Sequence, residues 1–160
     1  MKTKKLTTIF VLILILAIAV GTYNISLSEF RLSDSNYSYL AGLTWSRSLD
    51  KSLLQAQQEN KPVAMYFWAI WCQYCAKFQT DTLGNPQVKK ILQDDFIIVA
   101  MDLDVDKYVS YGSYSYNGYP PPKVLFLDPS GKELAGIYGA QDAAYFISVA
   151  TNVRDQVRSK

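Results

Sequence analysis

The sequence predicts one α/β domain in which helices cover the faces of a small β-sheet, preceded by an apolar N-terminal segment. Short apolar runs at 63–69, 96–101 and 124–127 have the length and composition of strands that are buried on both faces. Segments with apolar residues at helical spacing lie around these runs. The chain has 160 residues, enough for one ordinary domain and some additional sequence, and 49% of them are hydrophobic, enough for a core.

The first helix of the domain is predicted over Trp45–Glu59, where Leu49, Leu53 and Ala56 recur at helical spacing among polar residues. A Lys-Pro pair ends this helix, because proline cannot continue it. The strand at 63–69 follows, and a strand-to-helix turn is expected directly after it, around the two cysteines.

The later elements have local start and turn signals. Asn85-Pro86 has the pattern of a cap residue followed by proline in the first helical turn. Asp128-Pro129-Ser130-Gly131 is a turn signal, which predicts a hairpin between 124–127 and 133–138. Asp142 is the predicted cap of a last helix. The apolar face of that helix consists of Phe146, Val149, Ala150, Val153 and Val157.

The N-terminal segment is apolar and uncharged after three lysines. The run from Leu6 to Tyr23 is about long enough to cross a thin bilayer as a helix. It also resembles a signal peptide, because Ala17-Ile18-Ala19 has the small-x-small pattern of a cleavage site. We assign 1–23 to a signal anchor or a signal peptide and prefer the anchor; in both cases the positive-inside rule predicts that the rest is exported.

The segment at 24–43 is rich in Ser, Asn and Tyr and has no clear period. This composition is typical of a tether. We therefore expect a linker at 24–43 and the folded domain at 44–160.

Composition excludes several kinds of site. The formal net charge is +2, but without the three N-terminal lysines 13 of the 16 basic residues remain against 14 acidic ones, so no basic surface for nucleic acid is expected. The chain has no histidine, which removes the usual general base and the commonest zinc ligand. Its only two cysteines cannot close a tetrahedral zinc site by themselves, so we expect no metal and no organic cofactor.

The two cysteines form a Cys-x-x-Cys motif directly after the first apolar run. A helix that starts here would place Cys72 at its N-terminus, where free backbone N–H groups and the helix dipole favour a thiolate. Cys75 would lie on the same face and could attack a mixed disulfide formed at Cys72. A bridge across two residues constrains the unfolded chain little, so the spacing favours redox chemistry over a stabilising disulfide.

The stretch Phe67-Trp68-Ala69-Ile70-Trp71-Cys72-Gln73-Tyr74-Cys75 closely resembles the active-site stretch of the thioredoxin superfamily. The likeness extends over roughly Trp45 to Val157. Within the superfamily, this part of the sequence resembles the thioredoxin-like domains related to the C-terminal domain of transmembrane disulfide-interchange reductases. The resemblance implies a thioredoxin fold, with a central mixed β-sheet flanked by helices. The further motifs that carry it lie at 58–63, 85–88, 102–104 and 122–133.

The resemblance also implies roles for individual residues. Cys72 would attack, Cys75 would resolve, and a cis-proline would face them. Counting back from Phe126 and Asp128 selects Pro122 as that proline, although Gly118-Tyr119-Pro120 also resembles the usual approach to it. The alternative for the proline triplet is a polyproline II stretch in a surface loop. A backbone turned at such a proline could present polar groups to an extended substrate strand. The expected substrate-binding residues are Trp71, Gln73, Tyr74, Pro121 and Pro122.

Three positions depart from the family pattern. Tyr66 stands where thioredoxins usually carry a buried aspartate, and Met101 stands where they commonly carry a lysine on the next strand. The residue before Pro122 is another proline, Pro121. A carboxylate that could take the proton of the resolving thiol is therefore not visible in the sequence.

A run of tyrosines alternates with Ser and Gly before the prolines. It is interpreted either as a docking surface, since tyrosine combines contact area with a polar tip, or as a loop that covers its own core edge. The residues are Tyr108, Tyr111, Tyr114, Tyr116 and Tyr119.

Together these features predict an extracytoplasmic thiol–disulfide oxidoreductase, membrane-anchored or released, that acts as a monomer on protein thiols and disulfides, with a membrane redox partner as a further candidate. No histidine lies between the cysteines, which favours reductase or interchange activity over oxidase activity. Two alternatives remain open: a thioredoxin-fold binding or assembly module whose disulfide is structural, and a dimer that holds a metal or iron–sulfur cluster through cysteines of two chains.

Overall fold

The computed structural model describes residues 36–105 and 119–159. The predicted N-terminal segment, most of the predicted linker and the tyrosines at 108–116 lie outside the described residues. Within the described ranges, no helix is both long and apolar enough to cross a membrane.

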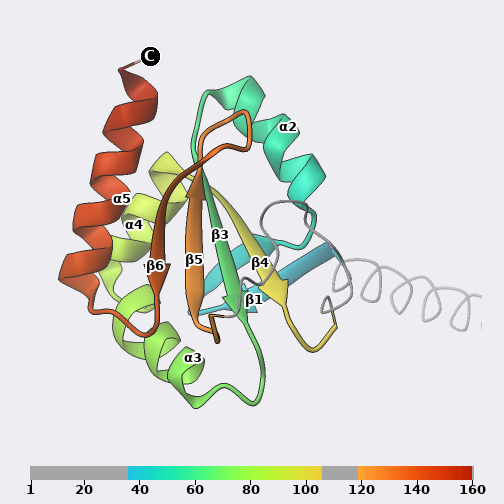
Figure 1. The fold of residues 1–160 in the computed structure, drawn as a ribbon, viewed down its shortest axis with the longest axis vertical. Coiled ribbons are helices and arrows are strands. Elements are labelled where there is room, and N and C mark those ends of the chain that lie inside the picture. The colour runs from blue at the N-terminus through green and yellow to red at the C-terminus, as the bar shows by residue number, and fades with distance from the viewer. Residues whose placement is uncertain (1–35, 106–118, 160) are drawn as a thin grey trace, which may run out of the picture. The chain divides into compact units, whose positions relative to one another are not determined.

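The described residues form a mixed β-sheet in the order β1-β2-β4-β3-β5-β6 (Figure 1). The central strand β3 is parallel to β4 on one side and antiparallel to β5 on the other. β6 pairs with β5 as the predicted hairpin, and β2 runs parallel to β4. The strands are β1 (Tyr37–Leu40), β2 (Leu43–Ser46), β3 (Val63–Trp68), β4 (Ile97–Asp102), β5 (Lys123–Leu127) and β6 (Glu133–Tyr138).

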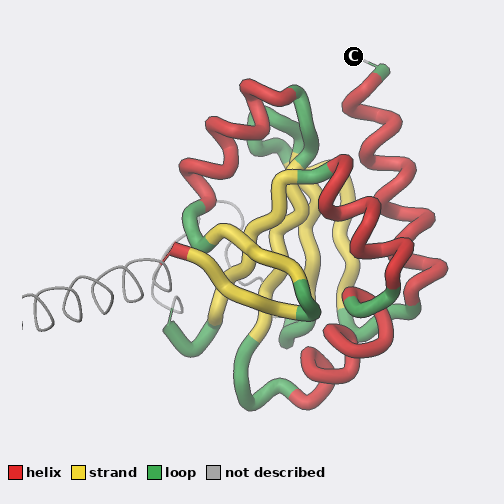
Figure 2. The backbone as a smooth tube through the Cα atoms, turned by 180° about the vertical axis from the view of Figure 1, so that it is seen from behind, coloured by secondary structure: helices red, strands yellow, loops and turns green. Residues whose placement is uncertain are grey.

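Helices cover both faces of this sheet, as the sequence predicts, and Figure 2 shows the strands between them. One face packs against α2, and the other packs against α3, α4 and α5. α3 continues into a short π-helix, η1. The helices are α2 (Leu49–Glu59), α3 (Gln73–Phe78), η1 (Gln79–Leu83), α4 (Pro86–Asp95) and α5 (Ala143–Arg158).

The predicted helix caps are confirmed at α4 and α5. The side chain of Asn85 accepts hydrogen bonds from the backbone N–H groups of Gln87 and Val88, and Pro86 occupies the first turn. Asp142 accepts from the N–H of Tyr145 in the same way. These bonds satisfy N–H groups that have no partner inside the helix, which explains why the two helices begin at these residues.

The predicted start of the first helix at Trp45 is wrong, because Trp45 lies in β2 and α2 begins at Leu49. Ser48 has an extended backbone and caps α2 by accepting from the N–H of Lys51. The indole of Trp45 is fully buried, donates to the carbonyl of Leu40 and packs against a ring on β3. Trp45 is therefore an apolar residue that is buried in the core from a strand, and it does not belong to the apolar face of a helix.

The hairpin of β1 and β2 lies partly inside the range 24–43. Ala41 and Gly42 form its turn, and both have a positive φ, of 55° and 73°. Leu40 and Leu43, on either side of the turn, are buried in the core. Ordered structure in the described residues therefore includes part of the segment that the composition assigns to a tether.

β3 positions the functional end of the domain. Met65 and Phe67 face α2, whereas Tyr66 faces the helices on the other side, and all three side chains are buried. This agrees with the prediction of a strand buried on both faces. The chain leaves β3 after Trp68 and enters α3 at Gln73, so the cysteine motif occupies the strand-to-helix turn, as predicted.

Candidate active site

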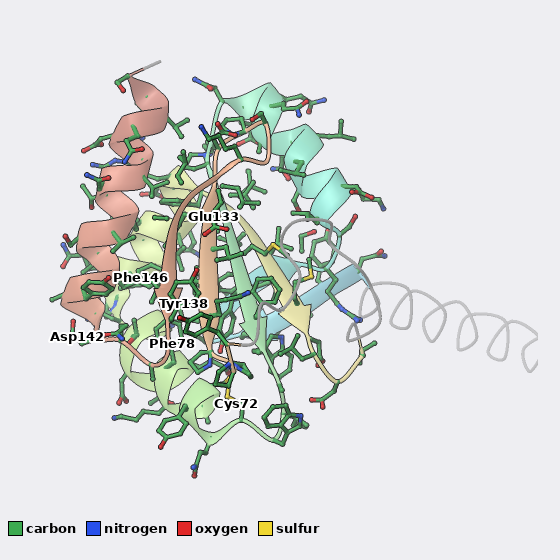
Figure 3. The ribbon with its side chains drawn as sticks, viewed as in Figure 1. Cys72, Phe78, Glu133, Tyr138, Asp142 and Phe146 are labelled. Carbon is green, nitrogen blue, oxygen red and sulfur yellow. A yellow bond between two sulfur atoms is a disulfide. The ribbon has the colours of Figure 1, made fainter. Side chains whose placement is uncertain are left out.

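Cys72 and Cys75 form a disulfide at the start of α3, with Cα atoms 5.2 Å apart. Cys72 is the N-cap residue, and its sulfur accepts a hydrogen bond of 3.1 Å from the backbone N–H of Cys75. Cys72 is 6% exposed and Cys75 is 1% exposed, so Cys72 is the more exposed residue of the pair. Figure 3 shows Cys72 at the end of the sheet, beside α3. This arrangement would stabilise a thiolate on Cys72 in the reduced protein.

The proline triplet lies against this disulfide. The Pro121–Pro122 peptide bond is cis, which confirms the expectation for Pro122. The carbonyl oxygen of Pro121 lies 3.3 Å from Cys72 Sγ, and the carbonyl of Pro122 accepts a 2.9 Å hydrogen bond from the N–H of Gly139. Pro121 and Pro122 are buried, whereas Pro120 is exposed. The start of β5 is therefore held between the cysteine motif and the end of β6.

The structure brings the other predicted contact residues to the same end of the sheet. Trp71 is 65% exposed and Tyr74 is 61% exposed, and Gln73 is also exposed. Tyr74 lines a groove together with the proline triplet, whereas Trp71 and Gln73 are not part of its lining. Of the tyrosine run, the described Tyr119 lines the groove.

Asp104 holds the loop that precedes Cys72, a role the sequence analysis missed. One carboxylate oxygen accepts from the backbone N–H of Ile70 and the other from the indole N–H of Trp71, each at 2.8 Å. Asp104 follows β4, which is parallel to β3, so both segments leave the sheet at the same edge. A sequence signal could have identified this role: an acidic residue just after β4, the strand that pairs with the strand preceding the cysteines.

The core beneath the site holds a neutral phenol. Tyr66 is fully buried between the rings of Trp45 and Phe78, and its hydroxyl accepts a 3.3 Å hydrogen bond from the side-chain amide of Gln79. Burial raises the pKa of Tyr66 to about 12, and the bond from Gln79 lowers it by less. The phenol therefore keeps its proton at physiological pH.

The register of β4 separates Met101 from Tyr66. Met101 pairs with Phe67 on the α2 face, and the β4 residue beside Tyr66 is Ala100. In the part of the chain that the structure describes, the only buried carboxylate is Asp128, in the turn between β5 and β6. Among these residues, no three His, Cys, Asp or Glu side chains come together as metal ligands.

Lys123 is a buried charge that the sequence analysis also missed. It is 2% exposed, directly follows Pro122 and pairs with Phe67, whose ring centroid lies 4.3 Å from the ammonium nitrogen. Burial lowers the pKa of Lys123, and the charge of Glu133 opposes that shift. The only sequence signal is a lysine at the start of an otherwise apolar strand.

We predict that Asp104→Ala loosens the loop before Cys72. Both hydrogen bonds to the carboxylate are lost, which should lower the free energy of unfolding by about 1–2 kcal/mol. The fluorescence of Trp71 should change, and the reaction rate of Cys72 with a small disulfide should fall several-fold. Asp94→Ala is the matched control, because it removes an exposed carboxylate paired with Lys90 on α4. Equal effects of the two substitutions would contradict a positioning role for Asp104.

We predict that Lys123→Met raises the stability at neutral pH by about 1 kcal/mol, because it keeps the apolar stem and removes a buried charge. The pKa of Lys123 is lower in the folded than in the unfolded chain, so the folded wild type gains stability as pH rises through the folded pKa. The advantage of the variant should therefore shrink at alkaline pH. Denaturant unfolding of both proteins between pH 7 and 10.5 measures the difference in their free energies of unfolding. A difference that grows with pH would contradict burial of the Lys123 charge as its cause.

Comparison with known proteins places this geometry in a family. Residues 49–154 match the family model of the thioredoxin-like domain. The thiol:disulfide interchange protein DsbD of Escherichia coli (strain K12) is 31% identical over 110 residues, which are 68% of this chain and 19% of DsbD. Anterior gradient protein 3 of Mus musculus is 30% identical over 98 residues, which are 61% of this chain and 56% of that protein. The chain thus spans about half or less of the length of these relatives.

Solved structures share the fold. A thioredoxin from Thermus thermophilus superposes with a TM-score of 0.52 at 23% identity, covering 67% of this chain and 84% of the thioredoxin. A DsbH oxidoreductase superposes with a TM-score of 0.53 at 19% identity, covering 71% of this chain and 85% of the other. With the matched family model and the disulfide at the start of α3, these findings show that the chain belongs to the thioredoxin-like family.

Proposed function

We propose that this protein is a thiol–disulfide oxidoreductase that exchanges disulfides with other proteins through Cys72 and Cys75. The observation that carries the proposal is the position of the pair: Cys72 caps α3, and its sulfur accepts the N–H of Cys75. Membership of the thioredoxin-like family and similarity to thiol:disulfide interchange proteins support it.

The reaction proceeds in two exchanges. The thiolate of Cys72 attacks one sulfur of a substrate disulfide; a Cys72–substrate bond forms, and the other substrate sulfur leaves as a thiolate that takes up a proton. Cys75 then loses its proton and attacks Cys72 Sγ, which forms the disulfide and releases the second substrate thiol. Two electrons pass from the cysteine pair to the substrate. Since Tyr66 stays protonated, water is the simplest acceptor for the proton of Cys75.

The surroundings of Cys72 would hold the substrate chain. An extended segment that lies along Pro121 and Pro122 would place its own sulfur at Cys72, because the carbonyl of Pro121 is in contact with Cys72 Sγ. Trp71, Gln73 and Tyr74 are exposed around the same sulfur and would supply side-chain contacts. Neither residue between the cysteines is charged, which favours reductase or interchange activity over oxidase activity.

We predict that Cys72→Ser abolishes reduction of insulin disulfides, whereas Cys75→Ser accumulates a mixed disulfide at Cys72. In the reduced wild type, alkylation of Cys72 should follow a pKa below the usual value of about 8.5 for a cysteine, so its rate should persist at neutral pH. Turbidity, mass spectrometry of the trapped adduct and alkylation rates from pH 5 to 9 measure these outcomes. A Cys72 thiol that is inert at every pH would instead support a binding module with a structural disulfide.

The N-terminal sequence supports an extracytoplasmic domain held by an apolar anchor at 1–23, because lysines precede the run and an uncharged stretch follows. We predict that the full chain fractionates with membranes, and that a membrane-impermeant thiol reagent labels reduced Cys72 in intact cells. Replacing the three N-terminal lysines with glutamate should reduce that labelling. Labelling only after lysis would contradict an external domain, and a processed chain lacking residues 1–19 would identify a cleaved signal peptide.

A further inference from the structure

The indole N–H of Trp68, the last residue of β3, is buried and has no hydrogen-bond partner in the part of the chain that the structure describes. A buried donor without an acceptor is destabilising, and such groups are rare in folded proteins. The other two tryptophans are satisfied, because Trp45 donates to the carbonyl of Leu40 and Trp71 donates to Asp104. Trp68 therefore holds a free donor while the disulfide is formed.

Trp68 lies against the cysteine pair at the start of α3. Its side chain packs against a buried cluster that contains Cys72 and Cys75. Tyr66 lies two residues earlier on the same face of β3 and contacts the ring of Phe78, which comes about one helical turn after Cys75. Trp68 is further along β3 toward the start of α3, so it is the residue of this face at the level of Cys75.

The sulfur of Cys75 accepts no hydrogen bond from any described residue while the disulfide is formed. Cys72 differs, because its sulfur accepts the backbone N–H of Cys75 and lies at the N-terminus of α3. Cys75 is 1% exposed, so water has little access to it. In the reduced protein, Cys75 is therefore a buried sulfur that needs a donor if it is to carry a negative charge.

We infer that the indole N–H of Trp68 donates a hydrogen bond to the sulfur of Cys75 once the disulfide is reduced. A disulfide sulfur is a weak acceptor and a thiolate is a strong one, so the bond forms in the reduced pair and is lost on oxidation. Trp68 thereby stabilises the reduced pair over the disulfide. This inference rests on the proposed function and names a further group of the same site that acts on Cys75.

The bond assists the resolving step without any transfer of the indole proton. The thiol of Cys75 gives its proton to water, and its sulfur attacks Cys72 Sγ. The Cys72–Cys75 bond forms, the bond from Cys72 to the substrate sulfur breaks, and the substrate sulfur leaves as a thiolate that takes up a proton. Before the attack, the N–H of Trp68 favours the thiolate of Cys75, although no described carboxylate is buried beside it.

Asp102 is the acceptor that competes with Cys75 for this donor. It pairs with Trp68 across β3 and β4, it is partly buried, and one of its carboxylate oxygens accepts the N–H of Asp104. The test therefore has to separate this carboxylate from the sulfur. The other charged or titratable groups on adjoining segments are Arg47 after β2, Asp104 after β4, Tyr66 on β3, Lys77 on α3 and Lys123 on the opposite face of the sheet.

The first measurement follows the indole N–H signals of the full chain by proton–nitrogen NMR, with the disulfide formed and reduced. The chain has three tryptophans, and the spectrum of Trp68→Phe identifies the signal of Trp68. On reduction this signal should move downfield, as expected when the N–H gains an acceptor. Reduced Cys75→Ala should keep the signal at its position in the oxidised protein, whereas Asp102→Asn should leave the downfield shift intact. The signal of Trp45, bonded to Leu40, is the internal control.

The second measurement is the equilibrium of the cysteine pair with glutathione. Trp68→Phe should shift the equilibrium constant about three- to tenfold toward the disulfide, because the reduced pair loses one hydrogen bond; the reduction potential falls by about 15–30 mV. Replacing Trp68 with benzothienylalanine, which has sulfur in place of the N–H and nearly the same shape, should have the same effect.

Trp45→Phe is the matched control for the second measurement. It removes a buried indole N–H that donates to a backbone carbonyl and does not depend on the cysteines. The substitution should therefore lower the stability of the oxidised and reduced proteins alike, and leave the equilibrium constant with glutathione unchanged to within about twofold.

An indole signal that stays in place on reduction, or a shift that survives in Cys75→Ala and disappears in Asp102→Asn, would overturn the inference. So would an equilibrium constant that neither replacement of Trp68 changes, or that Trp45→Phe changes as much. These results leave the proposed function standing, since Cys72 can still reduce insulin. A disulfide that neither glutathione nor dithiothreitol reduces in the folded protein would overturn the proposed function, and the inference with it. If Trp68→Phe does not fold, the benzothienylalanine variant remains as the test.

Discussion

The pairing of β3 with β4 on one side and β5 on the other is the constraint on which the site depends. β4 is parallel to β3 and β5 is antiparallel, so the ends of β3 and β4 and the start of β5 meet at one edge of the sheet. This edge places Pro121 against Cys72, 49 residues away in sequence, and Asp104 against Trp71, 33 residues away. The N-terminus of α3 favours a negative charge on Cys72. The segment after β4 holds the loop that precedes Cys72, and the segment before β5 lies against its sulfur.

The two faces of the sheet differ chemically beneath that edge. On the side of α3, Tyr66 is a neutral phenol whose hydroxyl is bonded to Gln79. On the side of α2, Lys123 is a buried cation over the ring of Phe67. Met101, which the sequence analysis placed at the position of a lysine common in thioredoxins, lies on the side of α2, and the register places Ala100 beside Tyr66. Among the described residues, the only buried carboxylate is Asp128, in the turn between β5 and β6, so in the proposed reaction water would take the proton of Cys75.

Among the described residues, several exposed apolar and aromatic side chains lie near Cys72. Ile70 and Trp71 are exposed on one side, and Tyr74, Tyr119 and Tyr138 are exposed along the groove. Large exposed apolar areas are uncommon on soluble domains and usually mark binding surfaces. Recognition by such a surface depends on apolar burial, whereas the chemistry at Cys72 depends on the start of α3. In the proposed function, substrate choice and reactivity would therefore depend on different residues, so substitutions could separate them.

The sequence by itself determined the features that depend on a few neighbouring residues. These are the caps at Asn85 and Asp142, the hairpin of β5 and β6, the buried character of β3 and the cysteine motif at a strand-to-helix turn. Only the tertiary structure decided that Trp45 belongs to a strand, since its burial comes from contacts such as that with Tyr66. The same holds for the hydrogen bonds of Asp104, the burial of Lys123 and the contact between the rings of Tyr119 and Tyr138 in the groove. These contacts join residues far apart in the chain, and the order in which strands pair, rather than local spacing, brings them together.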